Sequence, residues 1–190
     1  MSSYCIGKPG VYLVTGGSRS GKSKFAERLV SQYDDVAYIA TSVITDSEME
    51  RRVKKHKASR PNTWKVYEEP YDIKDVIAST DHEVYLVDCL TVLGTNFMFN
   101  DGCFEEDADL RLFEETEARY TGYIQETIDE IYAKGKRVVF VTNEVGSGLV
   151  PESGVSRAFR DMSGHVNQIV AQDSEAVWLV VSGIPVIIKG

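Results

Sequence analysis

The sequence predicts an α/β fold in which helices flank a mainly parallel sheet that ends in an antiparallel edge hairpin. Three observations lead to this prediction. Apolar segments typical of buried strands alternate with segments of helical periodicity. The first strand and helix are joined by the loop Gly16-Gly17-Ser18-Arg19-Ser20-Gly21-Lys22-Ser23. The last two apolar segments are separated only by Ser182-Gly183, which is typical of a hairpin turn.

The predicted strands are short runs rich in apolar and β-branched residues. They cover residues 11–15, 36–41, 84–88, 137–142, 176–181 and 185–188, with a shorter extended segment at 64–68. The predicted helices show helical spacing of apolar residues, a capping signal or helix-forming composition. They cover residues 25–33, 47–57, 72–79, 91–100, 105–133 and 156–172. Ser47 and Glu50 fit a capping box for the second helix, Pro61 limits its end, and Gly135 ends the long acidic helix.

Length and composition indicate a single globular domain, residues 1–190, with 43% hydrophobic residues and no linker. The net charge of −8 argues against a nucleic-acid partner. No apolar run approaches membrane-spanning length and no signal-peptide pattern is present, so a cytoplasmic protein without a membrane partner is expected. The three cysteines lack metal-binding spacing and are interpreted as reduced thiols.

The glycine-rich loop matches the Walker A pattern, with Gly16, Gly21, Lys22 and Ser23 in register. Glycines let backbone N–H groups approach a phosphate, and the following helix N-terminus favours negative charge. Lys22 is predicted to contact the β- and γ-phosphates, and the Ser23 hydroxyl is predicted to ligate Mg²⁺. The alternative is an ordinary strand-to-helix turn. We therefore expect the whole loop, residues 16–23, to bind a nucleoside triphosphate.

Other polar residues directly follow predicted strands, at the edge where ligands bind in parallel sheets: Thr41-Ser42, Asp88 and Asn143-Glu144. Asp88 follows four apolar residues, as a Walker B aspartate does. It can hold a Mg²⁺-bound water or accept a proton from an attacking hydroxyl; the alternative is a turn-capping aspartate. Two roles remain possible for Glu144: its carboxylate orients a nucleophile or a metal, or it is a plain loop residue.

A basic segment surrounds the first histidine, His56. Six of the 21 lysines and arginines lie between residues 51 and 60, which suggests either a confined anionic ligand or a solvated helix face. Helical spacing places His56 with Met49 and Val53 on one face. The nearby cations favour the neutral imidazole, which is a competent nucleophile toward phosphorus; the alternative is a histidine bonded to a carbonyl. His82 is expected to be solvated, and His165 to have a helix-surface or packing role.

Several stretches together resemble one family, the bifunctional adenosylcobinamide kinase / adenosylcobinamide-phosphate guanylyltransferases. They are Leu-Val-Thr-Gly-Gly-Ser-Arg-Ser-Gly-Lys-Ser (13–23), Tyr-Ile-Ala-Thr-Ser (38–42), the segment 46–61 with Trp64, Leu-Val-Asp-Cys-Leu-Thr (86–91) with Thr95-Asn96, and the segments 141–152, 159–168 and 181–189. The spacing His-x-x-x-Arg-Pro-x-x-Trp and the stretch Thr-Asn-Glu-Val-Gly-x-Gly are the specific ones. The resemblance covers nearly the whole chain except the acidic stretch 97–117, to which no role is assigned.

The resemblance implies two reactions: phosphorylation of adenosylcobinamide by a nucleoside triphosphate, and transfer of GMP from GTP to adenosylcobinamide phosphate. It implies that ATP, GTP and Mg²⁺ are used, with Ser23 and Asp88 at the metal. It implies that His56 carries a covalent GMP, with catalytic roles for Lys22 and Asp88. Guanine-nucleotide contacts are further implied for Thr41, Ser42, Lys57, Arg60, Glu68 and Asp88. A RecA-like core assembled as a homotrimer is also implied.

Two other interpretations remain open at this point. One is a kinase of another small alcohol in which His56 is structural. The other is a P-loop switch or DNA-dependent motor on a RecA-like core, which the acidic charge disfavours.

Overall fold

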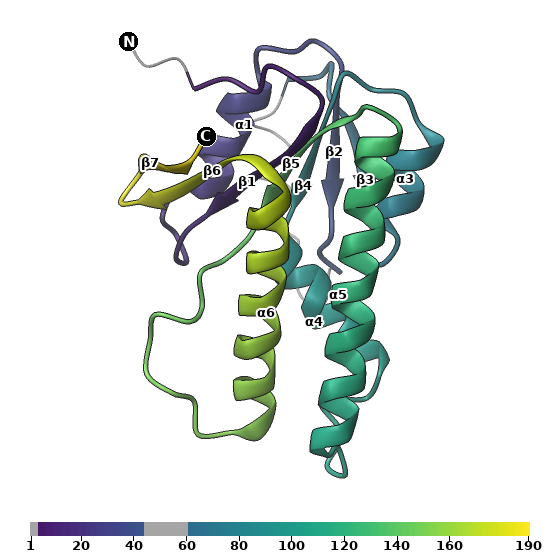
Figure 1. Cartoon of the computed structure of the whole chain (residues 1–190), viewed down its shortest axis with the longest axis vertical. Helices are drawn as coiled ribbons and strands as arrows, with labels where there is room; N and C mark the ends of the chain where they lie inside the picture. Colours follow the sequence, from purple (N-terminus) through teal and green to yellow (C-terminus); the bar gives the residue numbers. More distant parts are fainter. Residues whose placement is uncertain (1–3, 44–60) are drawn as a thin grey trace.

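A computed structural model describes residues 4–43 and 61–190. Its strands form one seven-stranded sheet in the order β3-β2-β4-β5-β1-β6-β7 (Figure 1). Neighbouring strands are parallel except for the antiparallel pair β6 and β7. The strands are β1 (Gly10–Thr15), β2 (Val36–Ala40), β3 (Lys65–Glu68), β4 (Val84–Asp88), β5 (Arg137–Val141), β6 (Ser174–Val181) and β7 (Ile184–Lys189). The predicted parallel sheet with an antiparallel edge hairpin is confirmed.

Helices cover both faces of the sheet. The described helices are α1 (Lys22–Val30), α3 (Ile73–Ser79), α4 (Leu90–Asn100), α5 (Leu110–Ala133) and α6 (Gly154–Asp173). Buried residues of α3, α4, α5 and α6 pack in one apolar cluster, whereas those of α1 pack in a second cluster on the opposite face. Figure 1 shows α5 and α6 running along the near face of the sheet, with α1 behind it.

The two apolar clusters explain why the sequences of the central strands are almost entirely apolar. Successive side chains of a strand point to opposite faces, so a sheet covered on both faces buries every position. In β1, Val11 and Leu13 pack with the α3–α6 cluster, while Tyr12 and Val14 pack with α1. The same alternation in β4 sends Val84 and Leu86 toward α1. This assignment of faces matters for the residue that ends β4.

The element boundaries differ most from prediction at two helices, and elsewhere by at most two residues. The long helix was expected from residue 105, but α5 begins at Leu110 because Asp109 is its N-cap, its carboxylate accepting from the Leu112 N–H at 2.9 Å. The first helix was expected to reach Tyr33, but α1 ends at Val30. The Tyr33 hydroxyl instead donates to the carbonyl of Ile6. The helix predicted at residues 47–57 lies outside the described residues.

The expectation that His82 is solvated is wrong. Its side chain is only 12% exposed. Nδ1 lies 2.6 Å from Asp35 Oδ1, and Nε2 lies 2.8 Å from the Tyr67 hydroxyl. Tyr67 and Tyr85 also contact the ring edge-on. The residues around His82 in the sequence are polar and gave no indication of these contacts. The ring links Asp35, the residue before β2, to Tyr67 of β3 and Tyr85 of β4.

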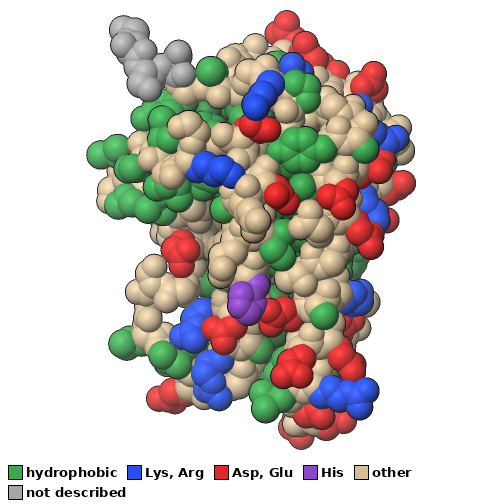
Figure 2. Space-filling view, in the orientation of Figure 1, with side chains coloured by type: hydrophobic (Ala, Val, Ile, Leu, Met, Phe, Trp, Pro, Cys, Tyr) green, Lys and Arg blue, Asp and Glu red, His purple; other side chains and the backbone are tan. Residues whose placement is uncertain are grey.

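The surface is uneven in character. Figure 2 shows acidic side chains concentrated over α5 and its neighbours, and apolar side chains gathered over the β6–β7 hairpin. The exposed apolar residues of the hairpin are Val181, Ile184, Val186, Ile187 and Ile188. None of the helices in residues 4–43 and 61–190 has the length and apolar character needed to cross a membrane. The three cysteines are free thiols.

Candidate nucleotide-binding site

The glycine-rich loop lies between the end of β1 and the start of α1, at the carboxyl edge of the sheet. A Cβ atom on Gly16 would lie 2.5 Å from the carbonyl oxygen of Val180 and 2.7 Å from Ser20 Oγ. Gly21, the residue before α1, has a φ of 95°, which side-chain-bearing residues rarely adopt. Both motif glycines are therefore required by this loop conformation as well as by the chemistry expected of it.

Neighbouring loops hold the glycine-rich loop in place. The N–H of Gly183, in the β6–β7 turn, donates to the Ser20 carbonyl at 2.7 Å. The N–H of Glu144, after β5, donates to the Gly16 carbonyl at 3.1 Å. Residues 17–19 are exposed, and Lys22 Nζ lies 3.3 Å from the Gly17 carbonyl. The loop is thus fixed from beneath while its middle and the Lys22 ammonium face outward.

Asp88 ends β4 on the same face of the sheet as α1. Strand alternation places its side chain with those of Val84 and Leu86, which pack against α1. The hydroxyl of Tyr38, which also packs there, donates to Asp88 Oδ2 at 2.8 Å. The carboxylate is therefore on the side of the sheet from which the glycine-rich loop enters its helix.

Cys89, the residue after Asp88, is buried at this edge of the sheet. The pKa of this thiol is raised to about 11, mainly by burial and next by the Asp88 charge, while the Lys22 charge is the smallest of the influences that lower it. The geometric link between the two charges is the sheet itself, because α1, which begins at Lys22, packs on the face that carries the Asp88 side chain. A cation from the glycine-rich loop and a carboxylate on the face that α1 covers are the charged groups that phosphoryl transfer requires.

Thr41, which follows β2, is bound tightly to the end of β4. Its N–H donates to the Asp88 carbonyl at 3.2 Å. Its hydroxyl donates to the Cys89 carbonyl at 2.9 Å and accepts from the Cys89 N–H at 2.8 Å. The Asp88–Cys89 peptide bond is cis. Thr41 is buried and Ser42 is partly exposed, so Ser42 is the better placed of the two to touch a ligand.

Asn96 has a structural role at this edge of the sheet that was not predicted from the sequence. It lies on α4, and its buried Nδ2 donates to the carbonyls of Thr41 and Pro70, each at 2.8 Å. These two bonds join α4 to the loops that follow β2 and β3. The signal in the sequence was a polar residue among the apolar positions of a buried helix.

Replacing Asn96 by leucine is expected to destabilise the protein by about 2–4 kcal/mol, because two carbonyls lose their donor in a buried site. The free energy of unfolding from urea titration measures this change. Asn100→Leu, on the same helix but exposed, is the matched control and should change stability by no more than about 0.5 kcal/mol. Equal unfolding midpoints for the two variants would contradict this role for Asn96.

The loop after β5 is held by a second side-chain network. The Thr91 hydroxyl accepts from the Asn143 N–H at 2.8 Å, and Asn167 Nδ2 donates to the Asn143 carbonyl at 3.2 Å. Glu144 is exposed, and its carboxylate accepts from the N–H of Gly146, two residues on. The structure shows what Glu144 contacts within its own loop. Its backbone supports the glycine-rich loop while its side chain turns back on its own loop.

The remaining predicted site residues lie farther away or outside the described residues. Glu68 ends β3, which is four strands from β1 at the edge of the sheet, and its side chain is exposed. The structure brings the loop after β3 to Thr41, since Glu69 N–H donates to the Ala40 carbonyl, and does not bring Glu68 to the glycine-rich loop. His56, Lys57 and Arg60 lie outside the described residues.

Mg²⁺ fits the residues at this edge. Among the described residues, no group of three or more histidine, cysteine, aspartate and glutamate side chains is placed to hold a metal. Mg²⁺ does not require such a cage, because it commonly takes one or two protein oxygens together with water and phosphate oxygens. The Ser23 hydroxyl, in the first turn of α1, and the Asp88 carboxylate are oxygen donors of this kind.

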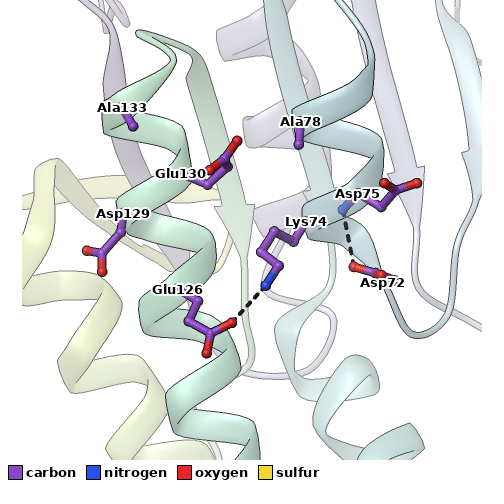
Figure 3. A pocket seen from close by; sticks show the side chains of 8 residues that line it. All are labelled: Asp72, Lys74, Asp75, Ala78, Glu126, Asp129, Glu130 and Ala133. Carbon is purple, nitrogen blue, oxygen red and sulfur yellow. Dashed lines mark hydrogen bonds and ion pairs between the residues drawn. The ribbon is translucent and has the colours of Figure 1, made fainter.

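A groove of about 520 Å³ between α3 and α5 is not suited to a nucleotide (Figure 3). Its walls carry Asp72, Asp75, Glu126, Asp129 and Glu130. The one lysine in it, Lys74, pairs with Glu126 at 2.7 Å. A triphosphate would be repelled by the net negative charge of this groove. The volume of the groove therefore does not identify it as the nucleotide-binding site.

Comparisons with known proteins agree with this geometry. A family model described as "Cobinamide kinase / cobinamide phosphate guanyltransferase" matches residues 12–188. The bifunctional adenosylcobalamin biosynthesis proteins CobU of Escherichia coli and Salmonella typhimurium are 44% and 43% identical to the chain, each match covering 93% of this chain and 98% of the relative. The bifunctional protein CobP of Pseudomonas aeruginosa is 38% identical over 94% of this chain and 96% of its own length.

Proposed function

Because the chain belongs to the cobinamide kinase / cobinamide phosphate guanyltransferase family, we propose that its glycine-rich loop serves both reactions and that His56 carries GMP between them. The observation that supports this proposal is the conformation of the glycine-rich loop before α1, together with the position of Asp88 at the end of β4 on the face of the sheet that α1 covers. Residues 16–23 hold the triphosphate, and Ser42 and Glu68 extend the nucleotide site along the same edge.

In the kinase step, the aminopropanol hydroxyl of adenosylcobinamide attacks the γ-phosphorus of ATP or GTP. The bond from that phosphorus to the β,γ-bridging oxygen breaks, and the nucleoside diphosphate leaves. Asp88 accepts the hydroxyl proton or orients a water that does so. Lys22 and the loop N–H groups stabilise the charge on the phosphate oxygens. Ser23 and Asp88 would hold Mg²⁺, which when bound would neutralise further charge on those oxygens.

In the guanylyl transfer, a neutral nitrogen of His56 attacks the α-phosphorus of GTP. The bond to the departing pyrophosphate breaks, and a phosphorus–nitrogen bond to GMP forms. A phosphate oxygen of adenosylcobinamide phosphate then attacks the same phosphorus. This breaks the phosphorus–nitrogen bond, gives adenosylcobinamide-GDP and restores the free imidazole. Lys57 and Arg60 are proposed to contact the nucleotide during this exchange.

The chain is further proposed to act in the cytoplasm as one domain that assembles into a homotrimer, without nucleic acid or membrane partners. The family, whose relatives are named as biosynthesis proteins, and the net charge of −8 support this proposal. Analytical ultracentrifugation of the purified protein measures the assembly, and a monomer would contradict the trimer.

One labelling experiment separates the proposed function from its alternatives. The protein is incubated with Mg²⁺ and GTP labelled at the α-phosphate, and the bound label is tested for stability. A phosphorus–nitrogen bond is cleaved by acid and survives base. Label with that behaviour, released by adenosylcobinamide phosphate, supports the proposal. Absence of label, with phosphate transfer to a simpler alcohol, favours a small-alcohol kinase, and nucleotide turnover that depends on DNA favours a motor.

A further inference from the structure

We propose that Tyr38 is a positioning residue that fixes the Asp88 carboxylate for phosphoryl transfer. This inference rests on the role proposed above for Asp88. Tyr38 lies on β2 two residues before the residue paired with Asp88, since the register places Ala40 opposite Asp88. Side chains two apart on a strand share a face, so the Tyr38 ring lies beside Leu86 and its hydroxyl reaches along β4 toward the carboxylate.

Tyr38 is well suited to fix a neighbouring group. Its side chain is only 4% exposed and packs in the apolar cluster beneath α1. A buried aromatic ring has few accessible rotamers, so its hydroxyl is held at one position. That hydroxyl donates to Asp88 Oδ2 at 2.8 Å. The bond restrains rotation of the carboxylate, whose other oxygen would then be the one that contacts Mg²⁺ or the substrate hydroxyl.

The partner of Tyr38 distinguishes it from other buried tyrosines of this protein. Tyr12, Tyr85 and Tyr120 donate to the main-chain carbonyls of Lys8, Thr80 and Leu90, respectively. Those bonds satisfy buried hydroxyls within the framework. Tyr38 instead donates to a side-chain carboxylate at the carboxyl edge of the sheet. The backbone of Asp88 is held separately, by the Thr41 N–H on its carbonyl, so the hydroxyl of Tyr38 is directed at the reacting end of the residue.

The test is Tyr38→Phe, which keeps the ring and removes only the donor. The kcat of corrinoid phosphorylation should fall about 10–100-fold, the range expected for losing a hydrogen bond to a charged group. The KM for the nucleotide should stay within about twofold, because the loop and Lys22 are unchanged. Tyr85→Phe is the matched control, since it also removes a buried hydroxyl from a central strand. It should leave kcat of the folded enzyme unchanged, with folded fractions of both variants measured by thermal unfolding.

A double-mutant cycle with Asp88→Asn tests the role of Asp88 and the positioning role of Tyr38 separately. If Asp88→Asn alone lowers kcat and adding Tyr38→Phe lowers it no further, the hydroxyl acts through the carboxylate. If Asp88→Asn lowers kcat but Tyr38→Phe does not, the positioning role is wrong while the role of Asp88 stands. Should Asp88→Asn leave kcat unchanged, the proposed role of Asp88 fails and Tyr38 has nothing to position. Multiplicative losses in the double variant would also contradict action through Asp88.

Discussion

Replacing Lys22 by alanine is expected to lower kcat/KM of both phosphorylation and guanylyl transfer by about 10²–10³-fold, the usual loss when one preorganised electrostatic contact to the reacting group is removed. The physical reason is that, in the proposed mechanism, a single loop holds the triphosphate in both reactions, whether the γ- or the α-phosphorus is attacked. The ammonium of Lys22 lies over that loop, 3.3 Å from the Gly17 carbonyl. Neither reaction can then keep its charge stabilisation without it.

The two reactions of the Lys22→Ala variant are measured separately, with corrinoid phosphorylation in one assay and covalent labelling by α-labelled GTP in the other. Lys24→Ala is the control, because Lys24 lies on the same helix and is exposed. This substitution also removes one positive charge. It should leave both rates within about twofold, as is usual for exposed surface positions. Loss of only one reaction in Lys22→Ala would show that the loop does not serve both.

Replacing His56 by alanine is expected to abolish covalent labelling by α-labelled GTP while phosphorylation of the corrinoid survives. The imidazole nitrogen forms the bond to the α-phosphorus in the proposed mechanism, and alanine offers no nucleophile in its place. Phosphorylation of the substrate hydroxyl uses the loop, Lys22 and Asp88, so it does not require that nitrogen. The overall rate of adenosylcobinamide-GDP formation should therefore fall to background in this variant.

A histidine outside the site provides the control for His56→Ala. His165 lies on α6, is exposed and pairs with Glu117 of α5. His165→Ala should label as strongly as the unmodified protein. Undiminished labelling of His56→Ala would remove His56 from the mechanism. Equal loss in both variants would indicate a general effect of replacing histidine rather than loss of the nucleophile.

Much of the fold could be predicted because its signals are local. The strand, glycine-rich loop and helix at residues 11–30 are specified by an apolar run, required glycines and a repeating apolar face. The hairpin at Ser182-Gly183 is specified by its turn residues. The start of α5 was missed because acidic composition continues through residues 105–109, and only the N-cap bond of Asp109 fixes the boundary.

The positions of some candidate site residues could be predicted for the same reason. Residues that follow strands, such as Thr41 and Asp88, could be placed at one edge from topology alone. The Tyr38–Asp88 bond and the two bonds of Asn96 join residues at least 26 positions apart in the sequence. Such contacts depend on which strands are neighbours and on which face each side chain lies, and no local pattern encodes them.

The most direct test of the shared-site account is peptide mass spectrometry of the protein after incubation with GTP and Mg²⁺. The account predicts GMP attached to the peptide that contains His56, and loss of that modified peptide in Lys22→Ala, because the same loop must hold GTP for the transfer. GMP on a different residue, or unmodified protein under conditions in which adenosylcobinamide-GDP is formed, would contradict it.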